Sequence, residues 1–171
     1  MSLTHVIRRQ DFRFGIEVLL DRRPRWLRTE RIGLVCHPAS VDRRLAHSAD
    51  RFRGAAGKRL VALFGPQHGA RGDKQDNMIE SDDFRDPRLG VPVFSLYGKT
   101  REPTQEMLRG IDVLLVDLQD VGTRVYTFVS TIIASLRAAA EFGCKVVVLD
   151  RPNPIGGDEV EGHTLEPEFR S

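Results

Sequence analysis

The sequence predicts an α/β fold with a mostly parallel β-sheet flanked by helices. Five short apolar runs, rich in Val, Leu and Ile, show little strict alternation of apolar and polar residues. Such runs are typical of strands that are covered on both faces. Segments with helical spacing lie between these runs, and the crossover connections of a β–α–β order make neighbouring strands parallel.

Each element follows from its own pattern. The predicted strands cover residues 31–36, 60–64, 91–96, 113–118 and 145–149. Helices are expected at 14–20 and 45–52, and the strongest at 126–142. The last helix carries one apolar stripe, formed by Phe128, Val129, Ile132, Ile133, Leu136 and Ala140. Gly143 directly follows it, and glycine at that point is typical of a helix C-terminal cap.

Two segments lack periodicity. Residues 69–90 are polar and form a long loop, and loops of that length are usually functional or mobile. Residues 152–171 are irregular and end without a closing element, so we expect a longer native chain. We interpret residues 1–171 as a single domain, since 171 residues suit one hydrophobic core.

Composition and charge argue against nucleic-acid-binding and membrane-spanning functions. The net charge of +2 provides no broad basic surface for nucleic acid, and no apolar run approaches the length of a membrane span. Cys36 and Cys144 lie at the edges of apolar runs, which predicts buried free thiols in a reducing compartment. The N-terminus lacks the apolar core of a signal peptide. A cytoplasmic protein without nucleic-acid or membrane partners is therefore expected.

Polar residues follow each predicted strand, and this pattern points to a ligand site. The carboxyl ends of parallel strands share one edge, where open α/β sheets bind their ligands. Turn formation alone explains the glycines and prolines there. It does not explain His68, Tyr97, Arg124 and Arg151, so we expect a ligand at this edge.

The sequence lacks the motifs of several common binding and catalytic sites. No GxGxxG follows the first strand, and the segment ending in Gly98-Lys99-Thr100 has Val93 where a phosphate loop needs glycine. Ser95 lacks a nucleophile elbow. His37 and His68 could meet Asp117 or Asp120 at a metal, but no spacing requires it. We therefore expect neither metal nor cofactor. Carboxylates remain as the groups that could act as catalytic acid, base or nucleophile.

Five segments in order resemble the NamZ/YbbC family of exo-β-N-acetylmuramidases, once described only as a domain of unknown function. They are FGPQHGARG at 64–72, SLYG at 95–98, DLQDVGTRVYT at 117–127, LDRPNP at 149–154 and VEG at 160–162. The resemblance covers nearly the whole chain. It implies a Rossmann-like N-terminal domain that helps release terminal N-acetylmuramic acid from peptidoglycan fragments in cell-wall recycling. It also implies a C-terminal auxiliary domain that is absent here.

These motifs lead to site hypotheses. Arg71, Arg124 and Arg151 are the expected partners of the lactyl carboxylate of muramic acid, since guanidinium binds carboxylate bidentately. The proposed acid and its partner are Glu161 and Glu80. Asp120 and His68 are also expected to take part in catalysis, and Asp120 could instead hold a sugar hydroxyl. The residues expected to bind substrate are Gln67, Tyr97, Asp117, Tyr126 and Asn153. Asp117 is in addition the reserve candidate for a catalytic carboxylate.

One departure from the family affects function. Many members carry Glu-His-Gly where this chain has Gln67-His68-Gly69. Glutamine cannot transfer a proton as a carboxylic acid does, although it can hold a hydroxyl group or position water. The alternative to a glycosidase is therefore a non-catalytic module that binds a sugar or pairs with another domain. An apolar surface left open by a missing domain would favour self-association.

Overall fold

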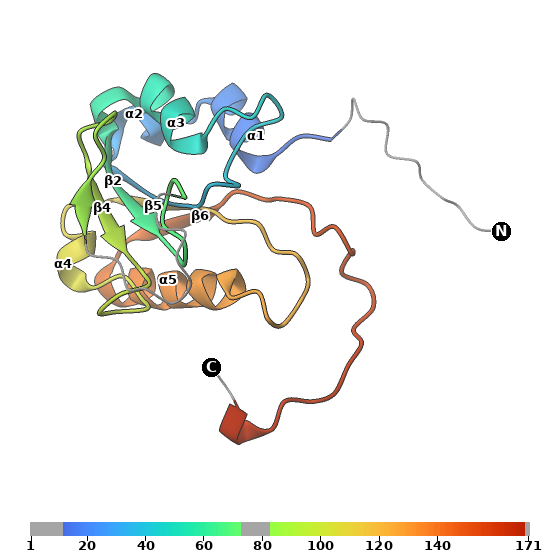
Figure 1. Cartoon of the computed structure of the whole chain (residues 1–171). Helices are drawn as coiled ribbons and strands as arrows, with labels where there is room; N and C mark the ends of the chain where they lie inside the picture. Colours follow the sequence, from blue (N-terminus) through green and yellow to red (C-terminus); the bar gives the residue numbers. More distant parts are fainter. Residues whose placement is uncertain (1–11, 73–82, 170–171) are drawn as a thin grey trace.

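The computed structural model describes residues 12–72 and 83–169, and its ribbon shows one sheet between two helical layers (Figure 1). The helices and strands, in chain order, are α1 Gly15–Arg22, α2 Trp26–Thr29, β1 Ile32–Cys36, α3 Ser48–Ala56, η1 Gly57–Arg59, β2 Leu60–Gly65, β3 Phe84–Arg85, β4 Pro92–Ser95, α4 Gln105–Leu108, β5 Val113–Asp117, α5 Phe128–Phe142, β6 Lys145–Val148 and η2 Pro167–Phe169. The predicted α/β fold is confirmed.

The sheet has six strands in the order β3-β4-β2-β1-β5-β6. Every pairing among the five predicted strands is parallel, and β3 alone runs antiparallel, beside β4. The central strands β1 and β5 are buried along their whole length, as near-continuous apolar runs predict. Their register pairs Ile32 with Val113 and Cys36 with Asp117, so both strands end at the same level.

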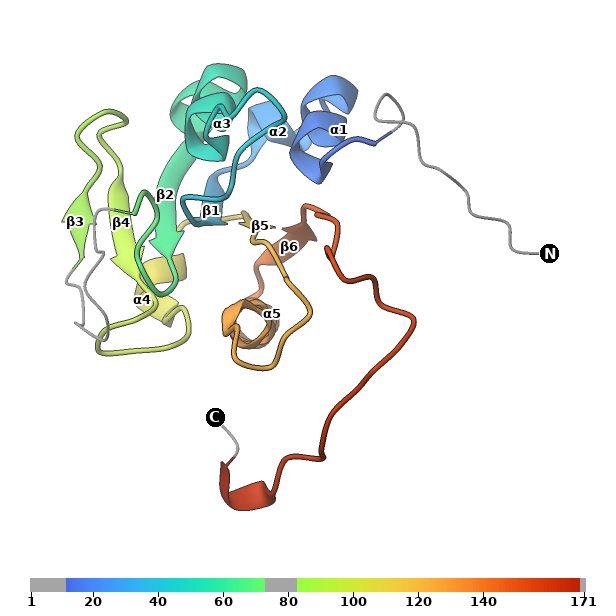
Figure 2. The same ribbon diagram turned by 45° about the vertical axis from the view of Figure 1, so that its right-hand side comes forward.

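The two faces of the sheet hold separate cores. Helices α1, α2 and α3 cover one face, and α4 and α5 cover the other (Figure 2). Phe52 of α3 belongs to the first core, which also contains Leu34 and Leu63 of the sheet. Phe128 of α5 belongs to the second core, with Phe64 and Leu114. Alternate residues of each strand therefore enter opposite cores.

Five short elements in the described part of the chain were not expected, namely α2, α4, η1, η2 and β3. The strand β3 lies inside the segment 69–90 that was predicted as a loop. Each spans only two to four residues, which is too short for a periodic pattern. Elements of that length form because the neighbouring structure positions them.

The helix α5 has the predicted C-terminal cap, with Gly143 in the left-handed region at φ 74°. Its orientation differs from the stripe seen in the sequence. Phe128, Ser135, Ala138 and Ala139 are its buried residues. Val129, Ile133 and Leu136 of the stripe are exposed, because the helix turns the face with Ser135, Ala138 and Ala139 toward the sheet.

The chain leaves the sheet after β6. From Pro152 onward the tail runs away from both layers and forms only η2 (Figure 2). Cys36 is buried and Cys144 is half-buried, and both are free thiols. Among the described residues, no helix combines the length and apolar character that a membrane crossing needs.

Candidate functional site

The strand order places a switch point between β1 and β5. Connections from β1 lead outward through β2 to β4 on one side, and the chain then returns to β5 on the other side. Ligands in doubly wound sheets usually bind in the crevice at such a point, outside the carboxyl ends of the strands. The residues after β1, β2, β4, β5 and β6 all reach this edge.

A buried ion pair occupies the switch point. The guanidinium of Arg151 donates to both carboxylate oxygens of Asp117, from Nε to Oδ1 at 2.6 Å and from an Nη to Oδ2 at 3.0 Å. The two side chains are only 3% and 1% exposed. The hydroxyl of Ser48 also donates to Asp117 Oδ2, and that of Ser40 donates to the Asp117 carbonyl. Arg151 donates further to the carbonyl of Val41 at 2.9 Å.

The segment between β1 and α3 therefore folds over the switch point. Its hydroxyls and carbonyls satisfy Asp117 and Arg151, both of which the sequence predicted as substrate ligands. Each charged group already has a partner of opposite charge inside the protein. In this arrangement the pair holds together the ends of β5 and β6 and the segment before α3.

Arg71 is likewise engaged within the protein. Its Nε donates to Asp86 Oδ2 at 2.5 Å, and an Nη donates to Asp50 Oδ1 at 2.9 Å. The hydrogen bond from Arg71 lowers the pKa of the Asp50 carboxyl below its usual value. These contacts tie the loop after β2 to α3 and to the turn between β3 and β4. The guanidinium that was expected to bind a substrate carboxylate thus binds two carboxylates of the chain.

Three histidines lie near the ends of β1 and β2. His68 adopts the left-handed region at φ 71°, and its ring centre is 6.5 Å from that of His37. His37 packs edge-on against Phe128 at 4.6 Å. Burial, together with the charges of His68 and His47, lowers the pKa of His37 to about 4. His37 is therefore neutral at pH 7.

His47 has a structural role. Its Nδ1 accepts from the backbone N–H of Ala49 at the start of α3, and its Nε2 lies 3.2 and 3.1 Å from the carbonyls of His37 and Ala70. The two carbonyl partners require Nε2 to carry the proton. Within residues 12–72 and 83–169, no three His, Cys, Asp or Glu side chains are grouped as a metal site requires.

A pocket of about 440 Å³ opens beside the loops after β2 and β4. We call it the Tyr97 pocket, and it is lined by Gln67, Leu96, Tyr97, Arg101, Thr127, Ser130, Thr131 and Ala134. The guanidinium carbon of Arg101 lies 3.8 Å from the ring centre of Tyr97. Thr127 Oγ1 donates to Gln67 Oε1 across 3.5 Å, which is a long hydrogen bond. The pocket is hydroxyl-rich, with one positive charge and no acidic side chain.

A second hollow, the Arg124 pocket, has a volume of about 400 Å³ and shares Ser130 with the first. Its lining residues are Asp120, Gly122, Thr123, Arg124, Tyr126, Val129 and Ser130. Asp120 Oδ1 accepts from the N–H of Gly122 at 3.0 Å, so this carboxylate also stabilises the turn. The two pockets lie on either side of the first turns of α5 and together bring Gln67, Tyr97, Asp120, Arg124 and Tyr126 to one region.

The other expected site residues lie elsewhere. Asn153 Oδ1 accepts from the N–H of Ile155 at 3.2 Å and so supports a turn at the start of the tail. Glu161 is exposed on the tail, and His68 is half-buried in the turn after β2; neither lines a pocket described above. Glu80 lies outside the described residues.

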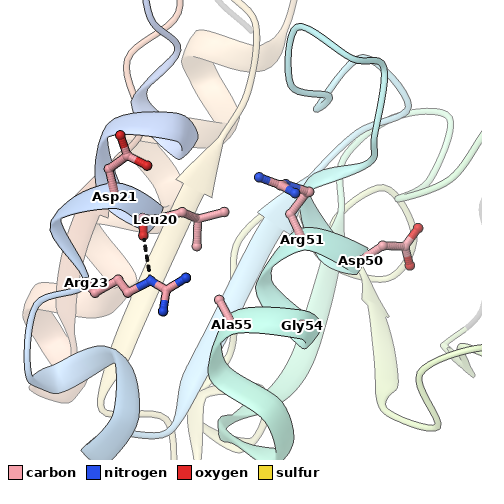
Figure 3. A pocket seen from close by; sticks show the side chains of 7 residues that line it. All are labelled: Leu20, Asp21, Arg23, Asp50, Arg51, Gly54 and Ala55. Carbon is pink, nitrogen blue, oxygen red and sulfur yellow. Dashed lines mark hydrogen bonds between the residues drawn. The ribbon is translucent and has the colours of Figure 1, made fainter.

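A further hollow lies on the helical layer, away from the strand ends. Figure 3 shows it between α1 and α3, lined by Leu20, Asp21, Arg23, Asp50, Arg51, Gly54 and Ala55. Arg23 Nε donates to the carbonyl of Leu20 at 3.3 Å (Figure 3). None of the residues predicted for the site lines this hollow, so the Tyr97 and Arg124 pockets define the candidate site.

Sequence reasoning missed Arg101, Ser130 and the hydroxyl of Thr127 as lining residues. Arg101 follows the end of the predicted strand 91–96 by five residues, so the rule that selected Tyr97 could be extended to Arg101. Ser130 belongs to a helix whose pattern was interpreted only as apolar. Its position at the pocket depends on the rotation of α5.

A family model and a curated relative both point to the same protein family. Residues 32–171 match the family model described as "Exo-beta-N-acetylmuramidase NamZ, N-terminal". Over 157 residues the chain is 48% identical to the peptidoglycan β-N-acetylmuramidase NamZ of Bacillus subtilis strain 168. That match covers 92% of this chain and 38% of the relative, so the chain spans about two fifths of that protein.

Two solved structures from Bacteroides fragilis NCTC 9343, both of DUF1343 family proteins, have the same fold. The first superposes with a TM-score of 0.82 at 45% identity, and covers 93% of this chain and 39% of its own. The second has a TM-score of 0.72 at 30% identity, covering 93% of this chain and 40% of its own. The fold is thus shared with these proteins.

Proposed function

This chain belongs to the family defined by the N-terminal part of the exo-β-N-acetylmuramidase NamZ, and from that membership we propose that it takes part in releasing terminal N-acetylmuramic acid from peptidoglycan fragments. The observation that carries the proposal is the pair of pockets around the first turns of α5, which share Ser130. They offer the aromatic rings of Tyr97 and Tyr126 together with hydroxyl and amide groups. Such linings suit a sugar, which presents apolar faces and many hydroxyl groups.

Most glycosidases use two carboxyl groups. One protonates the oxygen of the leaving group, and the other either attacks the sugar or activates water. We propose Glu161 and Glu80 for these roles. Glu161 is on an exposed tail, so it reaches the sugar only when the tail folds toward the pockets, and we infer that the implied auxiliary domain directs it there.

Nearer the pockets, Asp120 is the acidic residue that lines the site. It is proposed to hold a sugar hydroxyl or to assist the proton transfer. Arg124 and Tyr126, which line the same pocket, are proposed to contact the same sugar ring. Asn153 and His68 are proposed to support the adjoining turns. For Asp117, Arg71 and Arg151 we replace direct contact with the substrate by a positioning role, because their charges are neutralised inside the protein.

The second candidate function is sugar binding without catalysis. It is favoured by Gln67, which lines the Tyr97 pocket at the position where the resemblance implies a glutamate. It is also favoured by the absence of a paired set of carboxylates around the two pockets in the described part of the chain. Glutamine accepts and donates hydrogen bonds, so it can bind a sugar but cannot protonate its glycosidic oxygen.

Hydrolysis of a chromogenic β-N-acetylmuramide, with the matching β-N-acetylglucosaminide as control, separates the two functions. Muramide-selective release by the full chain supports the glycosidase. Saturable binding of N-acetylmuramic acid without release supports the binding module. If the chain neither binds nor cleaves the muramide, both proposals are wrong for this chain.

We further propose that the protein acts in the cytoplasm in cell-wall recycling and that it self-associates through α5. Two free thiols support a reducing compartment. The exposed Val129, Ile133 and Leu136 form an apolar face on α5, which supports association. A sedimentation experiment tests this part, since Ile133→Glu should shift a dimer to monomer; a monomeric parent chain would contradict it.

A further inference from the structure

The muramic acid unit differs from N-acetylglucosamine by a lactyl group that ends in a carboxylate, so a cation at the site can select muramic acid by binding that group. Arg71 and Arg151 are each bound to carboxylates of the protein. Arg101 is different: within residues 12–72 and 83–169 its guanidinium takes part in no ion pair or hydrogen bond, and its one described contact is with Tyr97. Its charge is therefore available to a ligand.

The contact with Tyr97 determines how Arg101 presents its donors. A guanidinium carbon 3.8 Å from the ring centre is within the range of a cation–π interaction. A guanidinium that stacks on a ring in this way uses its flat face and keeps the N–H groups at its edge for other partners. Those edge groups are the ones that form parallel hydrogen bonds to the two oxygens of a carboxylate.

The backbone on both sides of this pair is held in place. Leu96 is buried, and its N–H donates to the carbonyl of Gly65 at 2.8 Å, which attaches the loop to β2. The N–H of Tyr97 donates to Ser95 Oγ at 3.2 Å. Thr100 Oγ1 donates to the carbonyl of Glu102 at 2.8 Å, across Arg101. A site that is ordered before binding loses less entropy when the ligand arrives.

The rest of the Tyr97 pocket is complementary to a neutral sugar. Gln67, Thr127 and Ser130 offer amide and hydroxyl groups, whereas Leu96 and Ala134 are apolar. Among the residues that line the pocket, Arg101 is the charged one, and there is no carboxylate to repel an anion. A ligand with one carboxylate and several hydroxyl or amide groups fits this set.

We propose that Arg101, stacked on Tyr97, binds the lactyl carboxylate of a muramic acid unit in the Tyr97 pocket and thereby selects muramic acid over N-acetylglucosamine. This inference rests on the proposed function, because it names the group that distinguishes the substrate at the same site. Arg101 acts here as a specificity residue and takes no part in bond breaking.

Binding of N-acetylmuramic acid and N-acetylglucosamine to the full chain, measured by calorimetry, tests the inference. Arg101→Gln should weaken binding of N-acetylmuramic acid by about tenfold to a hundredfold, the usual loss for a hydrogen-bonded charge pair. Binding of N-acetylglucosamine should change by less than about twofold. Arg101→Lys keeps the charge but not the paired donors, so it should recover only part of the affinity.

Arg109→Gln is the matched control, because Arg109 is also exposed but lines a hollow at Gly110 and Phe142 instead of the Tyr97 pocket. It removes the same charge and should leave both affinities unchanged. Muramic-selective binding that persists in Arg101→Gln would overturn this inference and leave the proposed function standing. Failure of the parent chain to bind either sugar would overturn both, and equal affinity for the two sugars would overturn the inference.

Discussion

Removing Arg151 should destabilise the protein more than any exposed arginine does. The variant Arg151→Met keeps much of the side-chain volume but leaves the carboxylate of Asp117, which is 1% exposed, without its counter-charge. Breaking a buried pair in this way typically costs about 3–5 kcal/mol, because the remaining charge stays desolvated. The hydroxyl of Ser48 still donates to Asp117 and offsets part of the loss. We expect about 3 kcal/mol.

The control is the pair formed by Arg31 and Asp112. Their side chains are 53% and 39% exposed and the nearest atoms are 3.6 Å apart. Pairs of this kind contribute about 0–1 kcal/mol, so Arg31→Met should change the free energy of unfolding by less than 1 kcal/mol. The contrast between the two variants isolates the effect of burial from the loss of an arginine.

Urea denaturation at pH 7, followed by circular dichroism, measures both variants. With a slope of about 2 kcal/mol per molar urea, a loss of 3 kcal/mol lowers the midpoint by about 1.5 M. The double variant Arg151→Met/Asp117→Leu should recover part of the stability, because it removes the unpaired charge as well. Equal losses for Arg151→Met and Arg31→Met would refute the reasoning, since they would mean that Asp117 is solvated without Arg151.

Four further variants test the packing around the strand ends, the helix α3 and the candidate site. Gly65→Ala should destabilise the fold by a few kcal/mol in urea denaturation, since its Cβ would lie 2.7 Å from the backbone nitrogen of Ala70; Gly54→Ala, whose Cβ meets nothing within 4 Å on α3, should instead stabilise it by up to about 1 kcal/mol. His37 has a lowered pKa of about 4 in the folded state, so its contribution is present above the unfolded value near 6.5 and is lost as the pH falls toward 4. Wild type should lose about 1 kcal/mol more than His37→Gln between pH 7 and pH 5, after allowance for partial solvation, and parallel losses would contradict the assignment. Gln67→Glu should raise muramide turnover if this position lacks the needed acid; unchanged turnover would indicate that another residue supplies the proton.

The parallel sheet was predictable because its strands are buried on both faces. Residues 113–117, for example, are all buried, and a Val- and Leu-rich run this short between turn signals favours a strand covered on both faces. The positions of the loops followed from the same runs, since polar residues mark where each strand ends. The short strand β3 was not predictable, because its two residues pair with β4 only once the chain has returned to that edge.

The residues near the site were partly predictable for the same reason. Tyr97 and Gln67 follow strands that end at one edge, so their common neighbourhood depends only on topology. Whether an arginine faces a pocket or an internal carboxylate depends on partners that are distant in the chain. Arg151 and Asp117 are 34 residues apart, and nothing in either local sequence identifies the other as its partner.

The α/β class, the parallel strands and the edge at which polar groups gather follow from local sequence patterns, because burial and turn formation are properties of short segments. Which charges neutralise one another, and which face of α5 meets the sheet, emerges only when the elements pack together. Those outcomes depend on distances between side chains from different elements. Packing sets these distances after the elements have formed, and it leaves Arg101 of the described chain without an internal carboxylate and facing the Tyr97 pocket.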